Sequence, residues 1–275
     1  MKILLGLIYG SVYGASHVVP GLSGGTFLVI FGCYETVCEA FALNFKEIKK
    51  HFLFLLFFGI GTVGGFIGFV HAIVFFLERF EIQTALFFIG VILGGIPLII
   101  RLATEEEKLR PSCLLPFFLG LALVVSLFLL ELFGVFSAGI AQDNYFVFFV
   151  KILVYFIVAG VAMVMPGVSG AFILVAFGVY DMCMEAIKGF DFMILLPSVI
   201  GAIIGIIVGA KLVLLLIRKY KLMVYSVITG MVVGSLAPLL PSGLALNMAT
   251  VTGIICLLLG GLVAVFLGKR ESSNI

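Results

Sequence analysis

Ten apolar runs follow one another along the chain, and they limit its possible folds more than any other feature. Roughly 20 apolar residues cross the hydrocarbon core of a membrane as one helix, and a lipid-exposed backbone must satisfy its hydrogen bonds internally. We therefore expect an all-α integral membrane protein with no nucleic-acid partner. Only 11% of the residues are charged, against roughly 25% in soluble domains, which excludes a soluble fold. The runs lie at about 3–19, 23–42, 51–77, 82–100, 112–133, 146–165, 169–187, 192–217, 222–240 and 248–268.

A stretch near the N-terminus recurs in the second half of the chain. Residues 20–40 read PGLSGGTFLVIFGCYETVCEA, and residues 166–186 read PGVSGAFILVAFGVYDMCMEA. Most of the Pro, Gly, Ser, Phe, Tyr and Glu positions coincide at an offset of 146, and several later glycines coincide at an offset of 140. Self-similarity of this density indicates a duplicated structural unit. We predict two membrane repeats, 1–140 and 141–275.

Each repeat has an odd number of crossings, whether all five runs span or two of them form a re-entrant hairpin. The second repeat then starts on the opposite side of the membrane, which gives an inverted-topology repeat. We expect about six full spans plus four half-membrane helices, built around two re-entrant or broken hairpins.

The basic residues agree with this topology. Twelve Lys and Arg residues fall on the side that holds both termini, and three fall on the other. The first side comprises the termini, 46–50, 101–111 and 218–221; the three residues on the second are Arg79, Lys151 and Lys188. The positive-inside rule makes the first side cytoplasmic.

A Pro-Gly pair interrupts an apolar run at the same place in each repeat. Pro lacks an N–H and clashes with the preceding turn, so we expect helices to end near residues 19 and 165. A new helix can begin after each break with Ser23 or Ser169 as its N-cap. Its first N–H groups are free and lie at the positive end of the helix dipole, as in phosphate sites. Paired broken helices favour a transport site; two Pro kinks packed by small residues, with no ligand, are the alternative.

The candidate substrate-binding residues come from these motifs and from three polar residues in the apolar runs. The motif residues are Pro20, Gly21, Ser23, Gly24, Gly25, Thr26, Pro166, Gly167, Ser169, Gly170 and Ala171. His17 precedes the first break, and His71 and Lys211 occupy equivalent places in the two repeats. Lys211 either attracts a phosphate or extends to the membrane surface. Each histidine either binds phosphate, carries a proton, or is satisfied inside the helix bundle.

Two acidic pairs recur four residues apart after the motifs, at Glu35 and Glu39 and at Asp181 and Glu185. Residues at this spacing share one helix face. They are either solvated helix ends or groups that couple transport to protons or sodium or gate it. We expect Tyr34 and Tyr180 to anchor the chain at the membrane interface. No metal or cofactor motif occurs.

The motifs PGLSGGT at 20–26 and PGVSGAF at 166–172, each followed by the pattern G-x-Y-[ED], resemble the bacterial polyprenyl-phosphate transporter family, PopT. The resemblance covers essentially the whole chain. It implies a multi-pass protein of the bacterial inner membrane that returns undecaprenyl phosphate to the cytoplasmic leaflet, as a transporter and not an enzyme. Ala171 and Phe172 replace Gly25 and Thr26 in the second motif, so the two half-sites can contribute unequally.

Two other functions stay open at this point. Integral-membrane undecaprenyl-diphosphate phosphatases also have re-entrant breaks with PGxSRS-like motifs, but Gly24 and Gly170 stand where their arginine is expected. A small-ion permease is the second alternative. We favour alternating access of a lipid phosphate to one central site, assisted by close helix packing at Gly61, Gly64, Gly65 and Gly68 and at Gly201, Gly205 and Gly209. The coupling ion and the oligomeric state, monomer or homodimer, stay open.

Overall fold

The computed structural model describes residues 2–17, 22–105, 108–133, 144–241 and 248–271, and all regular structure in them is helical. The α-helices of the first half are α1 Lys2–Ser16, α2 Gly24–Ile30, α3 Tyr34–Phe41, α4 Phe45–Lys50, α5 Phe52–Arg79, α6 Glu81–Ala103 and α7 Leu114–Leu132. Those of the second are α8 Tyr145–Val164, α9 Gly170–Ala176, α10 Tyr180–Gly189, α11 Phe192–Gly234 and α12 Met248–Glu271. Two short 3-10 helices, η1 Pro111–Cys113 and η2 Ala237–Leu239, complete the described elements. The all-α prediction is confirmed.

Six stretches in the described part of the chain are long and apolar enough to cross a membrane. One of them, Phe192–Leu239, bends at Tyr220, whose φ of −141° and ψ of 48° are not helical. We call 192–219 and 221–234 the first and second arms of α11. The runs 23–42 and 169–187, expected as single helices, are each broken in two at Gly32 (φ 73°) and Gly178 (φ 67°). Glycine alone adopts such angles readily, and α9 and α10 consequently meet at 108°.

The backbone repeats along with the sequence. Ser23 (φ −101°, ψ 125°) matches Ser169 (φ −96°, ψ 130°), at the offset of 146. Phe80 (φ −138°, ψ 49°) matches Tyr220 (φ −141°, ψ 48°), at the offset of 140. This agreement supports two structural repeats, although the boundary between 140 and 141 lies outside the described residues. The division there and the inverted orientation stay predictions.

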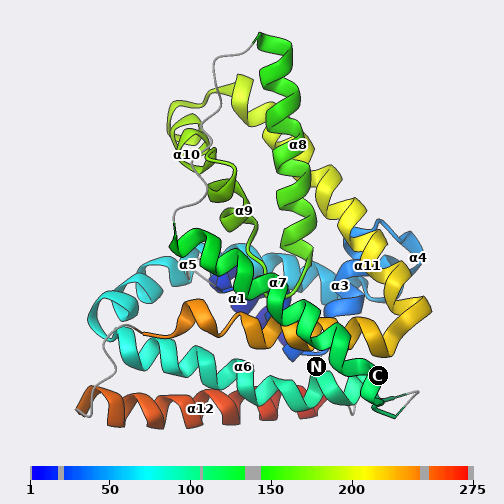
Figure 1. Cartoon of the computed structure of the whole chain (residues 1–275), viewed down its shortest axis with the longest axis vertical. Helices are drawn as coiled ribbons and strands as arrows, with labels where there is room; N and C mark the ends of the chain where they lie inside the picture. The colour runs from blue at the N-terminus through cyan, green and yellow to red at the C-terminus, as the bar shows by residue number, and fades with distance from the viewer. Residues whose placement is uncertain (1, 18–21, 106–107, 134–143, 242–247, 272–275) are drawn as a thin grey trace.

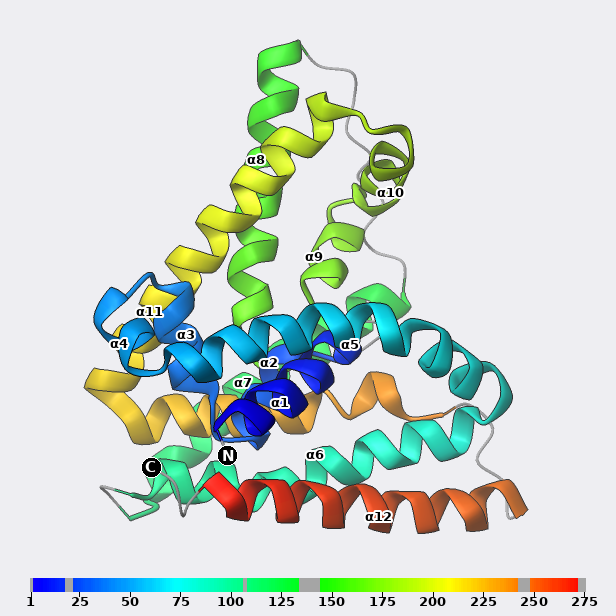
Figure 2. The ribbon, with the colours of Figure 1, turned by 180° about the vertical axis from the view of Figure 1, so that it is seen from behind.

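The helices form a lower layer and an upper body (Figures 1 and 2). The layer holds α1, α5, α6, α7, α12 and the second arm of α11, while α8, α9, α10 and the first arm of α11 rise from it. Helix α6 packs along α12, and α7 packs along α11. Since α6 corresponds to the second arm of α11 and α7 to α12, these are equivalent pairs in which each repeat supplies the partner of the other.

Small residues bring the paired helices into contact. A Cβ at Gly61 or Gly65 of α5 would overlap the backbone of α1, and one at Gly205 of α11 would overlap the backbone of α8. The same role expected of Gly64 and Gly68 is wrong, because nothing lies within 4 Å of a Cβ there. Both glycines are exposed on α5.

The segments that carry most of the basic residues lie toward one end of the layer. Figure 1 shows the start of α1, helix α4, the end of α6, the bend of α11 and the end of α12 toward the right, with the turn between α5 and α6 at the left. We call the right-hand end of the layer in this view the lysine-rich end. The charge grouping made from the sequence is therefore coherent in space.

Candidate functional site

The helix breaks set the geometry of the site. Helix α8 ends at Val164, where the prediction placed the break, and α9 restarts after Ser169. Helix α1 ends at Ser16 and α2 starts after Ser23, while Pro20 and Gly21 lie outside the described residues. Both serines are N-cap residues by position, but neither side chain makes a cap hydrogen bond. The predicted N-cap positions are therefore confirmed, without the side-chain hydrogen bond that usually accompanies them.

The hydroxyl of Ser23 instead reaches the other repeat. It donates to the carbonyl oxygen of Met165 at 3.3 Å, and the hydroxyl of Tyr34 donates to that of Val164 at 3.0 Å. Carbonyls at the end of a helix have no intrahelical partner, so the first repeat satisfies the interrupted end of α8. Tyr34 is only 1% exposed and is therefore not an interfacial anchor.

A third hydrogen bond runs in the opposite direction. The backbone N–H of Gly167 donates to the hydroxyl oxygen of Thr26 at 2.9 Å. Nearby, a Cβ on Gly25 would lie 3.2 Å from the Cα of Pro166. We call this contact between 23–34 and 164–167 the motif junction. Thr26, Gly25 and Pro166 thus hold the two motifs together rather than lining an open space.

A cavity of about 400 Å³ lies beside the junction and is lined by both motifs. We call it the central cavity. Its lining residues are His17, Leu22, Ser23, Gly24, Val124, Leu127, Phe128, Met163, Gly167, Val168, Ser169, Gly170, Ala171, Phe172, Val175, Tyr180 and Pro238. Seven of the candidate residues therefore meet in one space, from segments almost 150 positions apart.

The central cavity combines polar groups with an apolar wall. Its polar side chains are those of His17, Ser23, Ser169 and Tyr180, and the described lining contains no Lys, Arg, Asp or Glu. The first turn of α9, where backbone N–H groups lack helical acceptors, also faces it. Such a site can stabilise a negatively charged group through N–H and O–H donors, with one imidazole as its titratable base.

The two motifs contribute unequally, as their sequences suggest. Ser23 and Thr26 are buried and occupied in the motif junction, whereas Ser169 is half-buried beside the cavity. The counterpart of Thr26 is Phe172, which has no hydroxyl and forms part of the cavity wall. The second motif therefore presents more of its groups to a ligand.

Comparison with known proteins fits this geometry. Residues 13–255 match the model of the VCA0040-like family, described as undecaprenyl phosphate translocase-like. The chain belongs to this family. A relative from Vibrio cholerae named polyprenyl-phosphate transporter is 30% identical, over 88% of this chain and 79% of its own length. One of the same name from Staphylococcus aureus is 27% identical over 98% of both chains. No solved structure matches.

Lys211, another candidate, lies elsewhere in this translocase-like chain. It lines a second cavity of about 310 Å³ together with Glu39, Asn44 and Arg218. The side chain of His71, its counterpart on α5, lies outside the described residues. Neither residue is therefore placed in the central cavity.

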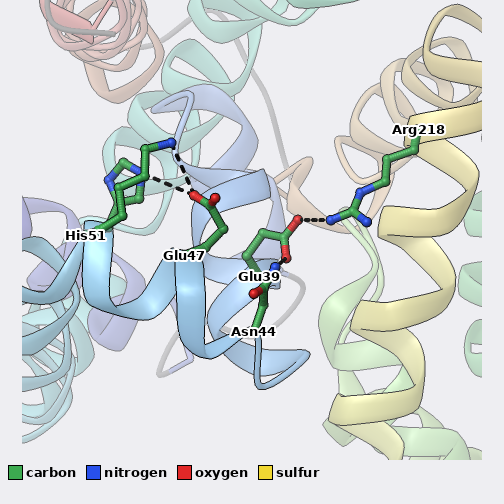
Figure 3. Close-up of polar contacts among 6 residues, drawn as sticks. Glu39, Asn44, Glu47, His51 and Arg218 are labelled. Atoms are coloured by element: carbon green, nitrogen blue, oxygen red, sulfur yellow. Dashed lines mark hydrogen bonds and ion pairs between the residues drawn. The ribbon is translucent and has the colours of Figure 1, made fainter.

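The acidic pair of the first repeat packs against α11 on both sides of its bend. Glu39 accepts from Arg218 at 2.5 Å and from Asn44 at 2.8 Å (Figure 3). Glu35 accepts from the hydroxyl of Tyr225 at 2.6 Å. These carboxylates thus connect α3 to α11 and are not simply solvated helix ends.

The acidic pair of the second repeat differs. Asp181 and Glu185 are exposed on α10 and make no hydrogen bond or ion pair within the described structure. The positions matching Arg218 and Tyr225 at the offset of 140 are Glu78 and Ala85, which cannot provide the same donors. A gating or coupling role stays a prediction for all four carboxylates.

Some functional positions escaped the sequence analysis. Val124, Leu127 and Phe128 form one wall of the central cavity, but α7 is almost entirely apolar and its sequence does not single out this face. Tyr180 was expected at the interface, although the G-x-Y-[ED] pattern next to the motif could have placed it at the cavity. Tyr225 had no such signal, because its partner Glu35 lies 190 positions away.

Proposed function

We propose that this protein is a transporter that moves a polyprenyl phosphate between membrane leaflets, with the phosphate bound in the central cavity. The observation that carries the proposal is that both interrupted motifs line one space. The names of the Vibrio cholerae and Staphylococcus aureus relatives support the choice of lipid. In a bacterial inner membrane the substrate is undecaprenyl phosphate, returned to the cytoplasmic leaflet, with both termini of the protein cytoplasmic.

The physical problem for such a carrier is the phosphate. An isolated ion in hydrocarbon is disfavoured by tens of kcal/mol on Born estimates. The N–H groups at the start of α9, the hydroxyls of Ser169 and Tyr180, and the imidazole of His17 offer the anion fixed dipoles and one group that can be positive. The apolar wall formed by α7 suits the first isoprene units, while the rest of the tail stays in the bilayer.

We propose alternating access as the mechanism. The α3 contacts to both arms of α11 and the motif junction are polar contacts between the two repeats, in addition to the packed helix pairs. Rearrangement of such contacts around a fixed site is the usual behaviour of transporters with paired repeats. If transport is coupled to protons or sodium, the groups that we propose to bind the coupling ion are the carboxylates of α3 and α10.

The test is transport in liposomes. Purified protein is reconstituted with a prenyl phosphate, and the phosphate groups exposed on the outer leaflet are followed over time. Ser169→Ala should slow equilibration, since the cavity loses a donor. Ser126→Ala, an exposed serine of α7 whose hydroxyl bonds to its own helix, is the matched control and should not. Equal rates for wild type and Ser169→Ala would count against the central site.

The same preparation separates a transporter from a phosphatase. The described cavity lining holds no arginine to grip a diphosphate, and glycines stand at the two expected positions. We expect no inorganic phosphate to be released from a prenyl diphosphate. Release at a rate that depends on Ser23 or Ser169 would favour the enzyme.

A further inference from the structure

The second cavity, which we call the basic cavity, has a chemistry of its own. It lies where the turn between α3 and α4 meets the first arm of α11, at the lysine-rich end. Ala42 and Asn44 line it from the turn, and Lys211, Leu214 and Arg218 from the helix. It shares no lining residue with the central cavity.

Two cations and one carboxylate line this cavity. Lys211 and Arg218 are seven residues apart and therefore lie on the same face of the helix, about two turns from each other. Lys211 makes no ion pair or hydrogen bond among the residues that the structure describes. Arg218 donates to Glu39 through one terminal nitrogen, which leaves the rest of its guanidinium fork for another acceptor. The cavity thus has spare capacity for an anion.

The rim of the basic cavity is apolar and faces outward. Leu215, which also lines it, is 61% exposed, and Leu43 and Phe45 beside it are 50% and 70% exposed. Leu43 is held at a φ of 59°, an angle unfavourable for a residue with a side chain. Exposed apolar side chains next to paired cations form the kind of surface that binds a lipid with an anionic headgroup.

We propose that the basic cavity is a second phosphate site, at which the headgroup of a lipid phosphate binds between Lys211 and Arg218 while its chain lies along Leu215. The inference rests on the proposed function in one respect: the lipid is the transported polyprenyl phosphate, held at the lysine-rich end before or after it occupies the central cavity. Glu39 is the internal competitor of the phosphate for Arg218, and Asn44 positions that carboxylate.

The competition gives two effects of opposite sign. Lys211→Gln removes a cation and should weaken binding at this site about fivefold, the usual effect of one basic residue at an anionic surface. Glu39→Gln removes the competing anion and should strengthen binding by a similar factor. Lys46→Gln, the same charge change on the exposed surface of α4, should leave binding at this site unchanged within twofold.

The experiment uses a photoreactive short-chain prenyl phosphate and the full chain in nanodiscs, with the labelled peptides identified by mass spectrometry. We expect label on 211–218 and 39–45 that falls in Lys211→Gln, rises in Glu39→Gln and persists in Ser169→Ala. Inorganic phosphate should compete only at concentrations far above those of the lipid; competition at equal concentration would show a free-phosphate site and overturn the lipid assignment.

The two proposals fail separately in this experiment. Label confined to the central cavity, or equal label at 211–218 in wild type and Lys211→Gln, would overturn the second site and leave the proposed function standing. Label at the basic cavity with none at the central cavity would argue against the central headgroup site instead. A prenyl alcohol with the same photoreactive group should label neither cavity, and equal labelling by it would refute recognition of phosphate.

Discussion

The motif junction makes a quantitative prediction at Thr26. This side chain is 1% exposed, and its hydroxyl oxygen accepts the N–H of Gly167 at 2.9 Å. Thr26→Val keeps the shape of the side chain and removes the acceptor. Gly167 cannot easily redirect its N–H, because its φ of 81° and its close approach to the carbonyl of Met231 fix the turn.

The expected effect follows from the cost of an unpaired donor. Leaving a fully buried N–H without an acceptor costs about 1–3 kcal/mol. The hydrogen bond of Gly167 is part-buried, so we expect a loss near the lower end, about 1 kcal/mol, which corresponds to a shift of roughly fivefold in any equilibrium that requires the junction to be closed. Thr26→Ser restores the hydroxyl and should recover most of the loss. Thr62→Val is the control, because the hydroxyl of Thr62 donates only to the carbonyl of Phe58 within its own helix.

The assay combines two readouts. Unfolding of the purified protein in mixed micelles gives the change in free energy of unfolding, and liposome transport gives the functional consequence. We expect Thr26→Val to be destabilised and altered in transport rate, with Thr26→Ser and Thr62→Val close to wild type. A Thr26→Val protein that matches wild type in both assays would refute the idea that the junction joins the two repeats.

Two further substitutions test the packing and the contact between α3 and α11. Gly65→Ala should destabilise the protein by about 1–3 kcal/mol through overpacking, because its Cβ would overlap the backbone of Ser11. Gly64→Ala is the control and should be neutral in the same unfolding assay. Equal losses of stability in the two variants would contradict the packing of α5 against α1. Tyr225→Phe removes a donor from the carboxylate of Glu35 and should cost about 1.5–3 kcal/mol. A loss below about 0.5 kcal/mol would mean that solvent replaces the hydroxyl without penalty.

Much of the architecture follows from the sequence because its signals are local. Apolar runs of membrane length mark each described helix of that size, and Pro166 marks the end of α8. The duplicated motif also predicts that the backbone angles at Ser23 and Ser169 agree. The second interruptions, at Gly32 and Gly178, were missed because a glycine in an apolar run does not by itself distinguish a kink from close packing.

The remaining features depend on contacts between residues far apart in the chain, which cannot be predicted from the pattern of a single sequence. Helix α6 of the first repeat packs against α12 of the second, and the contacting residues are more than 150 positions apart. Neither apolar sequence indicates which helix it packs against. The hydroxyl of Ser23 was expected to cap its own helix and instead serves the carbonyl of Met165. Lys211 lies in the basic cavity because the turn between α3 and α4 meets α11 there, a contact set by tertiary structure.

The most direct test of the central claim is a solved structure of the protein in nanodiscs with a short-chain prenyl phosphate at saturating concentration. The account predicts the phosphorus in the central cavity, between Ser23 and Ser169 and within hydrogen-bonding reach of the first turn of α9. Phosphate bound only at a site that neither motif touches, with the central cavity filled by side chains or by hydrocarbon, would contradict it.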